Sequence, residues 1–423
     1  MKYHKPSFFD QFKCIGSACT DTCCAGWEIE VDETTAEGYL TEKGAFGDRL
    51  RREIGSEPGE YFFKLQNNRC PFLNKENLCD IFINLGEDRL CDICREHPRF
   101  YNWFGDYTEV GLGLCCEEAE RLLFSDSKQL TFVEEVTQDE ELAEEMWHEA
   151  EDETEDVCQS VSEEQDDSDE NEHTDDFDLL DDESEECEQM LEERKAIFSI
   201  LQNRKKNIGA RLKRLLLQLP YADEILLLTV PILEWDDPES IPKLDYKAKP
   251  STNTLKNSAL FLIRFFGGME SLDETWPSMM KELEQNIDKL VDTDNTNAFL
   301  KFMKGENRLY EYEHIAVYMI YRYYPEILLD GQAEAKILFA AASICLLFLM
   351  DLHSFQKNTA YTQQDRIELV RRFSKEIEYC PENMERFMNR PPAKLGLDIF
   401  RQTCYTILRK CGHRTSASIS AFQ

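Results

Sequence analysis

The chain has 423 residues, of which 42% are hydrophobic, and its formal net charge is −37. This length and composition predict a soluble globular protein of two or three domains. Of the 84 acidic residues, 29 lie between Phe132 and Met190, where there is no Lys or Arg, so the other 55 nearly balance the 47 basic residues. The balance argues against nucleic-acid binding, which requires a basic face.

Cysteines are concentrated early in the chain, where ten of the sixteen lie between residues 14 and 116. The segment KCIGSACTDTCCAGW holds four of them, beside turn-forming Gly, Ser, Asp and Thr residues. The N-terminal sequence MKYHKPSFFDQFK lacks the apolar core of a secretory signal. We therefore expect a reducing, cytoplasmic location, in which disulfides do not persist.

The surroundings of these thiols favour a metal site over simple packing in a core. Zinc sites built from local ligands usually show two Cys-x-x-Cys motifs or a mixture of Cys and His. This segment has one Cys-x-x-Cys, formed by Cys91 and Cys94, and one nearby histidine, His97. An all-thiolate set with irregular spacing is more typical of an iron–sulfur cluster. Zinc remains the alternative.

The first 130 residues alternate short strand and helix signals. Residues 27–31 alternate apolar and acidic side chains, as a half-buried strand does, and Asp32 is suited to cap a helix over 33–43. The segment CPFLNKENLC predicts a reversal with Cys70 and Cys79 on its two sides. The other expected elements are a strand at 60–65, a helix over 87–96, a hairpin over 99–114 and a helix from Cys116.

Residues 131–190 contain acidic blocks whose self-repulsion opposes a compact state, so we predict a disordered or loosely helical insert there. Residues 191–423 show apolar positions at helical spacing. The predicted class is therefore α+β, with a small N-terminal cysteine-rich α+β metal or iron–sulfur domain over 1–130 and a larger all-α helical domain over 191–423. Its later helices are expected near 251–267, 278–304, 307–324, 333–353, 363–378 and 383–389.

The longest apolar run, residues 337–350, has fourteen residues and is too short to span a bilayer. We expect a buried core helix and no transmembrane segment, with association at a membrane surface as the alternative. We expect His97 to be a surface residue that precedes a proline, with a fifth metal ligand or a general base as the alternatives. Cysteines outside the N-terminal group are expected to pack in the core (Cys345, Cys380, Cys404, Cys411) or, in the acidic run, not to be ligands (Cys158, Cys187).

Several blocks resemble the flagellin lysine-N-methylase family. They are FKCIGSACTDTCCAGWEIEVDETT, RCPFLNKENLCDI, CREHPR and CCEEAER in the first third, and ILQNRKKNIGARLKRLLL, ENRLYEYEHIAVYMIYRYYPEIL and FSKEIEYC later. The resemblance implies transfer of a methyl group from S-adenosylmethionine to lysine ε-amines, with flagellin as the protein partner. It also implies a [4Fe-4S] cluster. The family's cysteines match Cys14, Cys19, Cys23, Cys24, Cys70, Cys79, Cys94 and Cys116, and leave Cys91 and Cys115 as extras.

Eight candidate ligands exceed the needs of one cluster, so either two metal sites exist or some thiols only surround the metal. Neither a catalytic residue nor the pocket for S-adenosylmethionine can be named from the sequence. Two other functions stay open. One is a non-catalytic zinc- or iron-binding protein, and the other is a redox sensor based on the vicinal pair Cys23 and Cys24.

Overall fold

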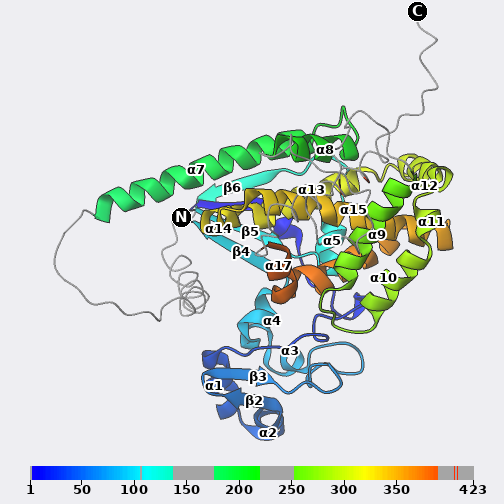
Figure 1. Cartoon of the computed structure of the whole chain (residues 1–423). Helices are drawn as coiled ribbons and strands as arrows, with labels where there is room; N and C mark the ends of the chain where they lie inside the picture. Colours follow the sequence, from blue (N-terminus) through cyan, green and yellow to red (C-terminus); the bar gives the residue numbers. More distant parts are fainter. Residues whose placement is uncertain are drawn as a thin grey trace, which may run out of the picture.

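The computed structural model describes residues 2–104, 107–136, 176–219 and 252–388, together with residues 404 and 407. Helices dominate, and short strands are gathered near the N-terminus, which agrees with the predicted α+β class (Figure 1). The described residues form two hydrophobic cores. A small core lies within residues 29–94, and a large one extends from Leu114 to the C-terminal helices.

The small core belongs to residues 13–97, which we call the cysteine lobe. Asp32 caps α1 (Glu33–Thr41) as predicted, because its carboxylate accepts a hydrogen bond of 2.8 Å from the Thr35 N–H. The rings of Phe63 and Phe72 meet edge to face and fill the centre of the lobe. The other elements are η2 (Gly16–Ala18), α2 (Gly44–Glu53), β2 (Ile54–Glu57), β3 (Glu60–Phe63), α3 (Asp80–Leu85), η3 (Glu87–Arg89) and α4 (Asp92–Glu96).

The main sheet has the strand order β4-β5-β1-β6. The hairpin predicted over 99–114 is confirmed as the antiparallel pair β4 (Arg99–Phe104) and β5 (Tyr107–Leu112). Strand β1 (Lys2–Pro6) lies parallel to β5 and antiparallel to β6 (Phe132–Val136). The cysteine lobe is therefore inserted between β1 and β4, and both of its ends attach to one sheet (Figure 1).

The large core is built around α15 (Ala333–Lys357), which is buried from Ala335 to His353. Helix α15 is long and apolar enough to cross a membrane, and no other described helix is, but its whole apolar window is buried inside the fold. It is the core helix predicted from residues 337–350. Helix α13 (Tyr310–Tyr323) packs along it.

The other elements of the helical part follow in chain order. They are α5 (Glu117–Leu123), α7 (Asp176–Leu201), α8 (Ile208–Gln218), α9 (Thr252–Gly267), α10 (Thr275–Gln285), α11 (Ile287–Leu290), α12 (Thr293–Gly305), η7 (Tyr324–Glu326), α14 (Ile327–Asp330), α16 (Gln363–Phe373), the π-helix η8 (Ser374–Glu378) and α17 (Pro381–Met388).

Two predictions about these elements are wrong. Residues 27–31 do not form a strand, since only Glu30 makes an isolated bridge, to Phe62. The insert predicted over 131–190 as disordered or loosely helical is too wide, because the paired strand β6 and the part of α7 that reaches the large core fall inside it. Strand β6 is held by its pairing with β1, and Met190 of α7 is buried in the large core. The rest of that insert, residues 137–175, lies outside the described residues.

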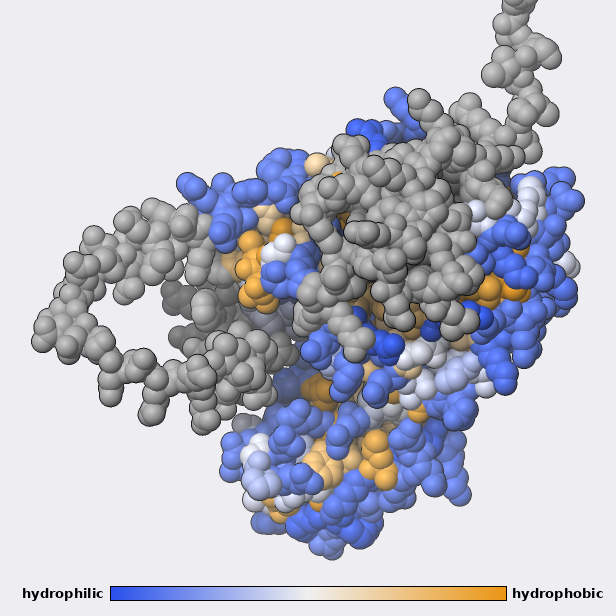
Figure 2. All heavy atoms as spheres, in the orientation of Figure 1, coloured by the Kyte–Doolittle hydropathy of each residue, from blue (hydrophilic) through white to orange (hydrophobic). Residues whose placement is uncertain are grey.

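The surface of the cysteine lobe is not uniformly polar. Figure 2 shows a largely hydrophilic face on which hydrophobic atoms also appear over this lobe. Four large hydrophobic side chains of the lobe are exposed, namely Leu40, Phe82, Ile83 and Ile93. The lobe therefore presents apolar contact area to solvent in addition to its thiols.

Candidate metal centre

The loop that carries the first cysteines is anchored on the start of α5. The carboxylate of Glu117 accepts hydrogen bonds from Thr20 N (2.8 Å), Thr20 Oγ1 (2.6 Å) and the Cys19 thiol (3.6 Å). Cys116, the residue before Glu117, is the N-cap of α5. This anchoring brings Cys116 to a loop almost 100 residues earlier in the sequence.

Four thiols gather at this point, and we call Cys14, Cys19, Cys23 and Cys116 the first thiol set. Burial and the charge of Glu117 raise the pKa of Cys19 to about 11, and Cys14 adds to that shift. Burial raises the pKa of Cys116 to about 12, with further contributions from Cys19 and Cys14. Each thiol is therefore close enough to the others to oppose their ionisation.

Five more thiols form a second set inside the cysteine lobe, Cys24, Cys70, Cys79, Cys91 and Cys94, and all five belong to or pack against its core. The Cys70 N–H donates to the Cys24 carbonyl at 2.8 Å, and Cys79 pairs with Leu73 across the predicted reversal. Burial raises the pKa of Cys70 to about 12, with contributions from Cys24, Cys79 and Cys91. The turn and α4 thus bring together thiols that are spread over 70 residues.

The vicinal cysteines link the two sets. The Cys23 thiol donates a hydrogen bond to the Cys24 sulfur, which raises the pKa of Cys23 and lowers that of Cys24 to about 7. The charges of Arg69 and Lys375 lower the pKa of Cys24 further. Within this vicinal pair, Cys24 is therefore the thiol that ionises more readily.

The donor chemistry of both sets fits a metal that prefers sulfur. All of these cysteines are free thiols. Within the described ranges, no three His, Cys, Asp or Glu side chains lie as close together as metal ligands do. Buried thiolates are costly unless a cation offsets their charge, and zinc and iron–sulfur clusters are the usual cations of all-thiolate sites.

The cysteine loop is also held by the helical part of the chain. Asp21 forms ion pairs with Arg371 of α16 and with Lys375 of the π-helix, the latter at 2.8 Å. Lys375 also donates to the Thr22 carbonyl at 3.1 Å and lies 4.7 Å from the centre of the Trp27 ring. A π-helical turn is uncommon and often occurs at functional sites. Here it carries the lysine that holds the loop.

His97 and Cys115 lie behind this contact. Burial, with the charge of Lys375, lowers the pKa of His97 to about 4, and its ring packs against Trp27. The prediction that His97 is a surface residue is therefore wrong. Cys115 is buried beside His97 and Tyr379 and does not belong to the first thiol set. That position agrees with the expectation that Cys115 is an extra cysteine.

Several polar residues of this region escaped the sequence analysis. Both carboxylate oxygens of Glu120 and one of Glu378 are buried without a hydrogen-bond partner among the described residues. Burial, with the charge of Glu378, raises the pKa of Glu120 well above its usual value. The other oxygen of Glu378 accepts from Tyr318 and Tyr323, at 2.9 and 2.8 Å. Charged residues inside the apolar face of a helix were the signal that could have identified them.

The remaining cysteines lie away from both thiol sets. Cys345 and Cys404 are buried in the large core, as predicted, and the Cys345 thiol contacts the Cys404 carbonyl at 3.8 Å. Cys380 is half-buried beside Glu382, and Cys187 is half-buried on α7. The predictions for Cys158 and Cys411 lie outside the described residues.

Comparison with known proteins relates the chain to one group of proteins. Residues 194–390 match the model of the FliB lysine N-methylase C-terminal domain. Flagellar biosynthetic protein FliU of Salmonella muenchen is 32% identical over 129 residues, which are 29% of this chain and 76% of that protein. Lysine-N-methylases of Salmonella typhimurium and Salmonella choleraesuis are each 31% identical over 137 residues. That alignment spans 31% of this chain and about a third (34%) of either enzyme. No solved structure matches.

Proposed function

Because the chain belongs to the FliB lysine N-methylase family, we propose that it transfers methyl groups from S-adenosylmethionine to lysine ε-amines of flagellin in the cytoplasm. The match over residues 194–390 carries this proposal. That range contains Arg371 and Lys375, which hold the cysteine loop. The family's domain therefore contacts the loop that carries most of the first thiol set.

We further propose that the first thiol set holds a [4Fe-4S] cluster. Its four thiols equal the number that such a cluster requires. When bound, the cluster would supply a centre for one-electron transfer. The second thiol set is proposed as a separate site, for which zinc fits because Cys91 and Cys94 form a Cys-x-x-Cys motif. This division explains why the chain has more candidate ligands than one cluster needs.

Methyl transfer places a requirement on the acceptor. A lysine ε-amine attacks a sulfonium methyl group only when it is neutral, since an ammonium has no lone pair. The acceptor site must therefore lower the pKa of the substrate lysine by burial or by a neighbouring cation. The apolar and aromatic surroundings of Lys375 lower the pKa of that residue in the same way, chiefly by burial.

The test is methylation of purified flagellin with methyl-labelled S-adenosylmethionine under anaerobic, reducing conditions. We expect label on lysine, and no label when the flagellin lysines are blocked beforehand by acetylation. The C116S variant should lose iron and activity, while the matched C345S variant, changed in the helical core, should keep both. Metal content without any methyl transfer by the wild-type protein would refute the enzyme proposal and favour the non-catalytic metal-binding protein.

A further inference from the structure

An open pocket of about 730 Å³ lies where three helices begin or end. Its walls come from the segment after α5 (Ser125–Ser127), the turn between α12 and α13, and the start of α16. The volume falls within the range of about 300 to 1,000 Å³ that is usual for small-molecule sites. None of its lining residues is a thiol, so the pocket is distinct from both thiol sets.

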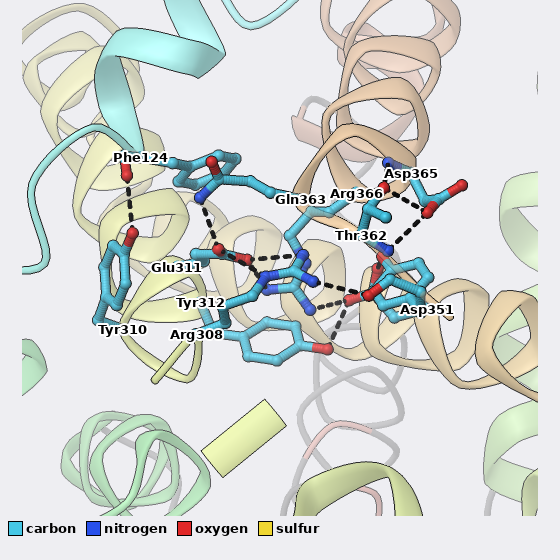
Figure 3. A network of polar contacts seen from close by, with 11 residues as sticks. Phe124, Arg308, Tyr310, Glu311, Tyr312, Asp351, Thr362, Gln363, Asp365 and Arg366 are labelled. Atoms are coloured by element: carbon cyan, nitrogen blue, oxygen red, sulfur yellow. Dashed lines mark hydrogen bonds and ion pairs between the residues drawn. The ribbon is translucent and has the colours of Figure 1, made fainter. Parts of the chain in front are cut away.

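A buried ionic network fixes one wall of the pocket (Figure 3). Arg308 donates to Glu311 at 3.0 and 3.3 Å and to the Tyr361 carbonyl at 3.1 Å. Behind it, Arg366 lies between Glu311 and Asp351. Two arginines and two carboxylates balance in charge, so the network can stay buried without a net charge. The position of Arg308 is therefore set before any ligand binds.

Arg308 keeps donors available for a ligand. A guanidinium has five N–H groups, and the three hydrogen bonds of Arg308 leave one N–H on each terminal nitrogen. A guanidinium is the side chain that binds a carboxylate with paired hydrogen bonds. At the start of α16 the capping box already satisfies the backbone N–H groups of Thr362 and Asp365, and Gln363 adds its own N–H at the same wall. This wall is thus suited to an anionic carboxylate.

Other lining residues suit a nucleobase and a cation. Phe302 and Tyr310 are half-exposed aromatic residues of the lining. The Tyr310 hydroxyl donates to the Phe124 carbonyl at 2.7 Å, which holds the ring in place (Figure 3). Aromatic rings of this kind stack on nucleobases regardless of base identity. Glu306 and Asp126 add carboxylates at the rim, where an amino or sulfonium group would find opposite charge.

The pocket is connected to the first thiol set by neighbouring residues. Gln363 lines the pocket and donates to Glu311 at 2.9 Å. The next residue, Gln364, donates to Glu117 at 3.0 Å, and Glu117 is the carboxylate that anchors Cys19. One turn of α16 therefore contacts both sites.

We propose that this pocket binds the methyl donor, a nucleoside that carries a zwitterionic amino-acid chain. The Arg308 wall takes the carboxylate, and Tyr310 and Phe302 take the base. The inference rests on the proposed function, because lysine methylation is the reaction that requires such a donor. It adds a location and the residues that recognise the ligand.

The experiment measures the dissociation constants of S-adenosylhomocysteine and adenosine for the full-length, metal-loaded protein by calorimetry. We expect Y310A to weaken both ligands about tenfold or more, because both contain the base. R308K keeps the charge but loses the paired donors, so it should weaken S-adenosylhomocysteine and leave adenosine unchanged. The matched control is F82A, which changes an exposed aromatic residue of the cysteine lobe.

The outcomes separate the two proposals. If the wild-type protein methylates flagellin while Y310A and R308K bind both ligands as the wild type does, the pocket assignment is wrong and the proposed function stands. If the wild-type protein methylates nothing and binds neither ligand, the proposed function fails. A defect of R308K that is equal for both ligands would indicate damage to the fold and would overturn the role of Arg308.

Discussion

Gly113 offers a direct test of how the π-helix is seated against the sheet. It follows β5, and a Cβ atom at this position would lie 1.9 Å from the Tyr379 hydroxyl oxygen and 2.9 Å from its ring carbon Cζ. Tyr379 is packed between Trp27 and Arg322, so it has little room to move. Overpacking of this kind costs about 1 to 3 kcal/mol. We therefore expect G113A to lower the free energy of unfolding by that amount.

The measurement is urea unfolding at pH 7, followed by circular dichroism. The double variant G113A/Y379F removes the nearer of the two clashing atoms and should recover part of the loss, whereas the clash with Cζ remains. Gly305 provides the matched control, because no atom lies within 4 Å of a Cβ built there. G305A should change stability by less than about 0.5 kcal/mol.

The result that would refute the reasoning is a G113A variant as stable as G305A. It would mean that Tyr379 can leave its position at no cost. The contact of the π-helix with the sheet would then not contribute to the fold. A double variant less stable than G113A alone would show that the hydroxyl of Tyr379 stabilises the protein more than its clash costs.

Three further changes test the buried polar groups. Because the pKa of Glu120 is raised in the folded protein, folding retains a proton that the unfolded chain releases above about pH 4.3. The contribution of Glu120 to the free energy of unfolding therefore falls by up to about 1.4 kcal/mol per pH unit as pH rises. The free energy of unfolding of E120Q, measured by urea titration, should therefore rise relative to that of the wild type from pH 5 to pH 8. A difference between the two proteins that does not change with pH would contradict this. R366M should cost about 3 to 5 kcal/mol, measured in the same way, because it leaves Asp351 buried without its partner. K375M removes an ion pair with Asp21 and should speed hydrogen exchange in residues 19–27, and unchanged exchange would argue against the anchoring role.

The elements that the sequence predicted well depend on local signals. Asp32 caps α1 through its own neighbour Thr35, and the helices near 251–267 and 333–353 follow from apolar residues at helical spacing. The strand predicted over 27–31 did not form, because alternation alone does not fix how far a segment pairs. Residues 29–31 contact β3 only through one isolated bridge and two backbone hydrogen bonds, so the pairing ends before a strand is established. Local patterns thus identify elements, and contacts across the chain decide whether they pair.

The candidate site was predicted in its residue types and not in its arrangement. Eight of the nine cysteines in the two sets were candidates from the sequence, and Cys91, expected to be an extra, lies in the second set. The division into two sets depends on Cys23 and Cys24 having different neighbours, which no spacing rule shows. Lys375 and Arg308 were missed for a related reason. Their roles arise from partners 353 and 53 residues away, Thr22 and Tyr361.

The insertion of the cysteine lobe between β1 and β4 has a consequence for the order of events during synthesis. Strand β1 leaves the ribosome first, yet its partners begin only at Tyr107 and Phe132, so at about 5 to 20 residues per second it waits for several seconds. The thiols of the second set all lie within residues 24–94 and are complete by then. The first set must wait for Cys116 and for the helices that carry Lys375. The second set can therefore assemble on the nascent chain, whereas the first set closes only after the later helices have been made.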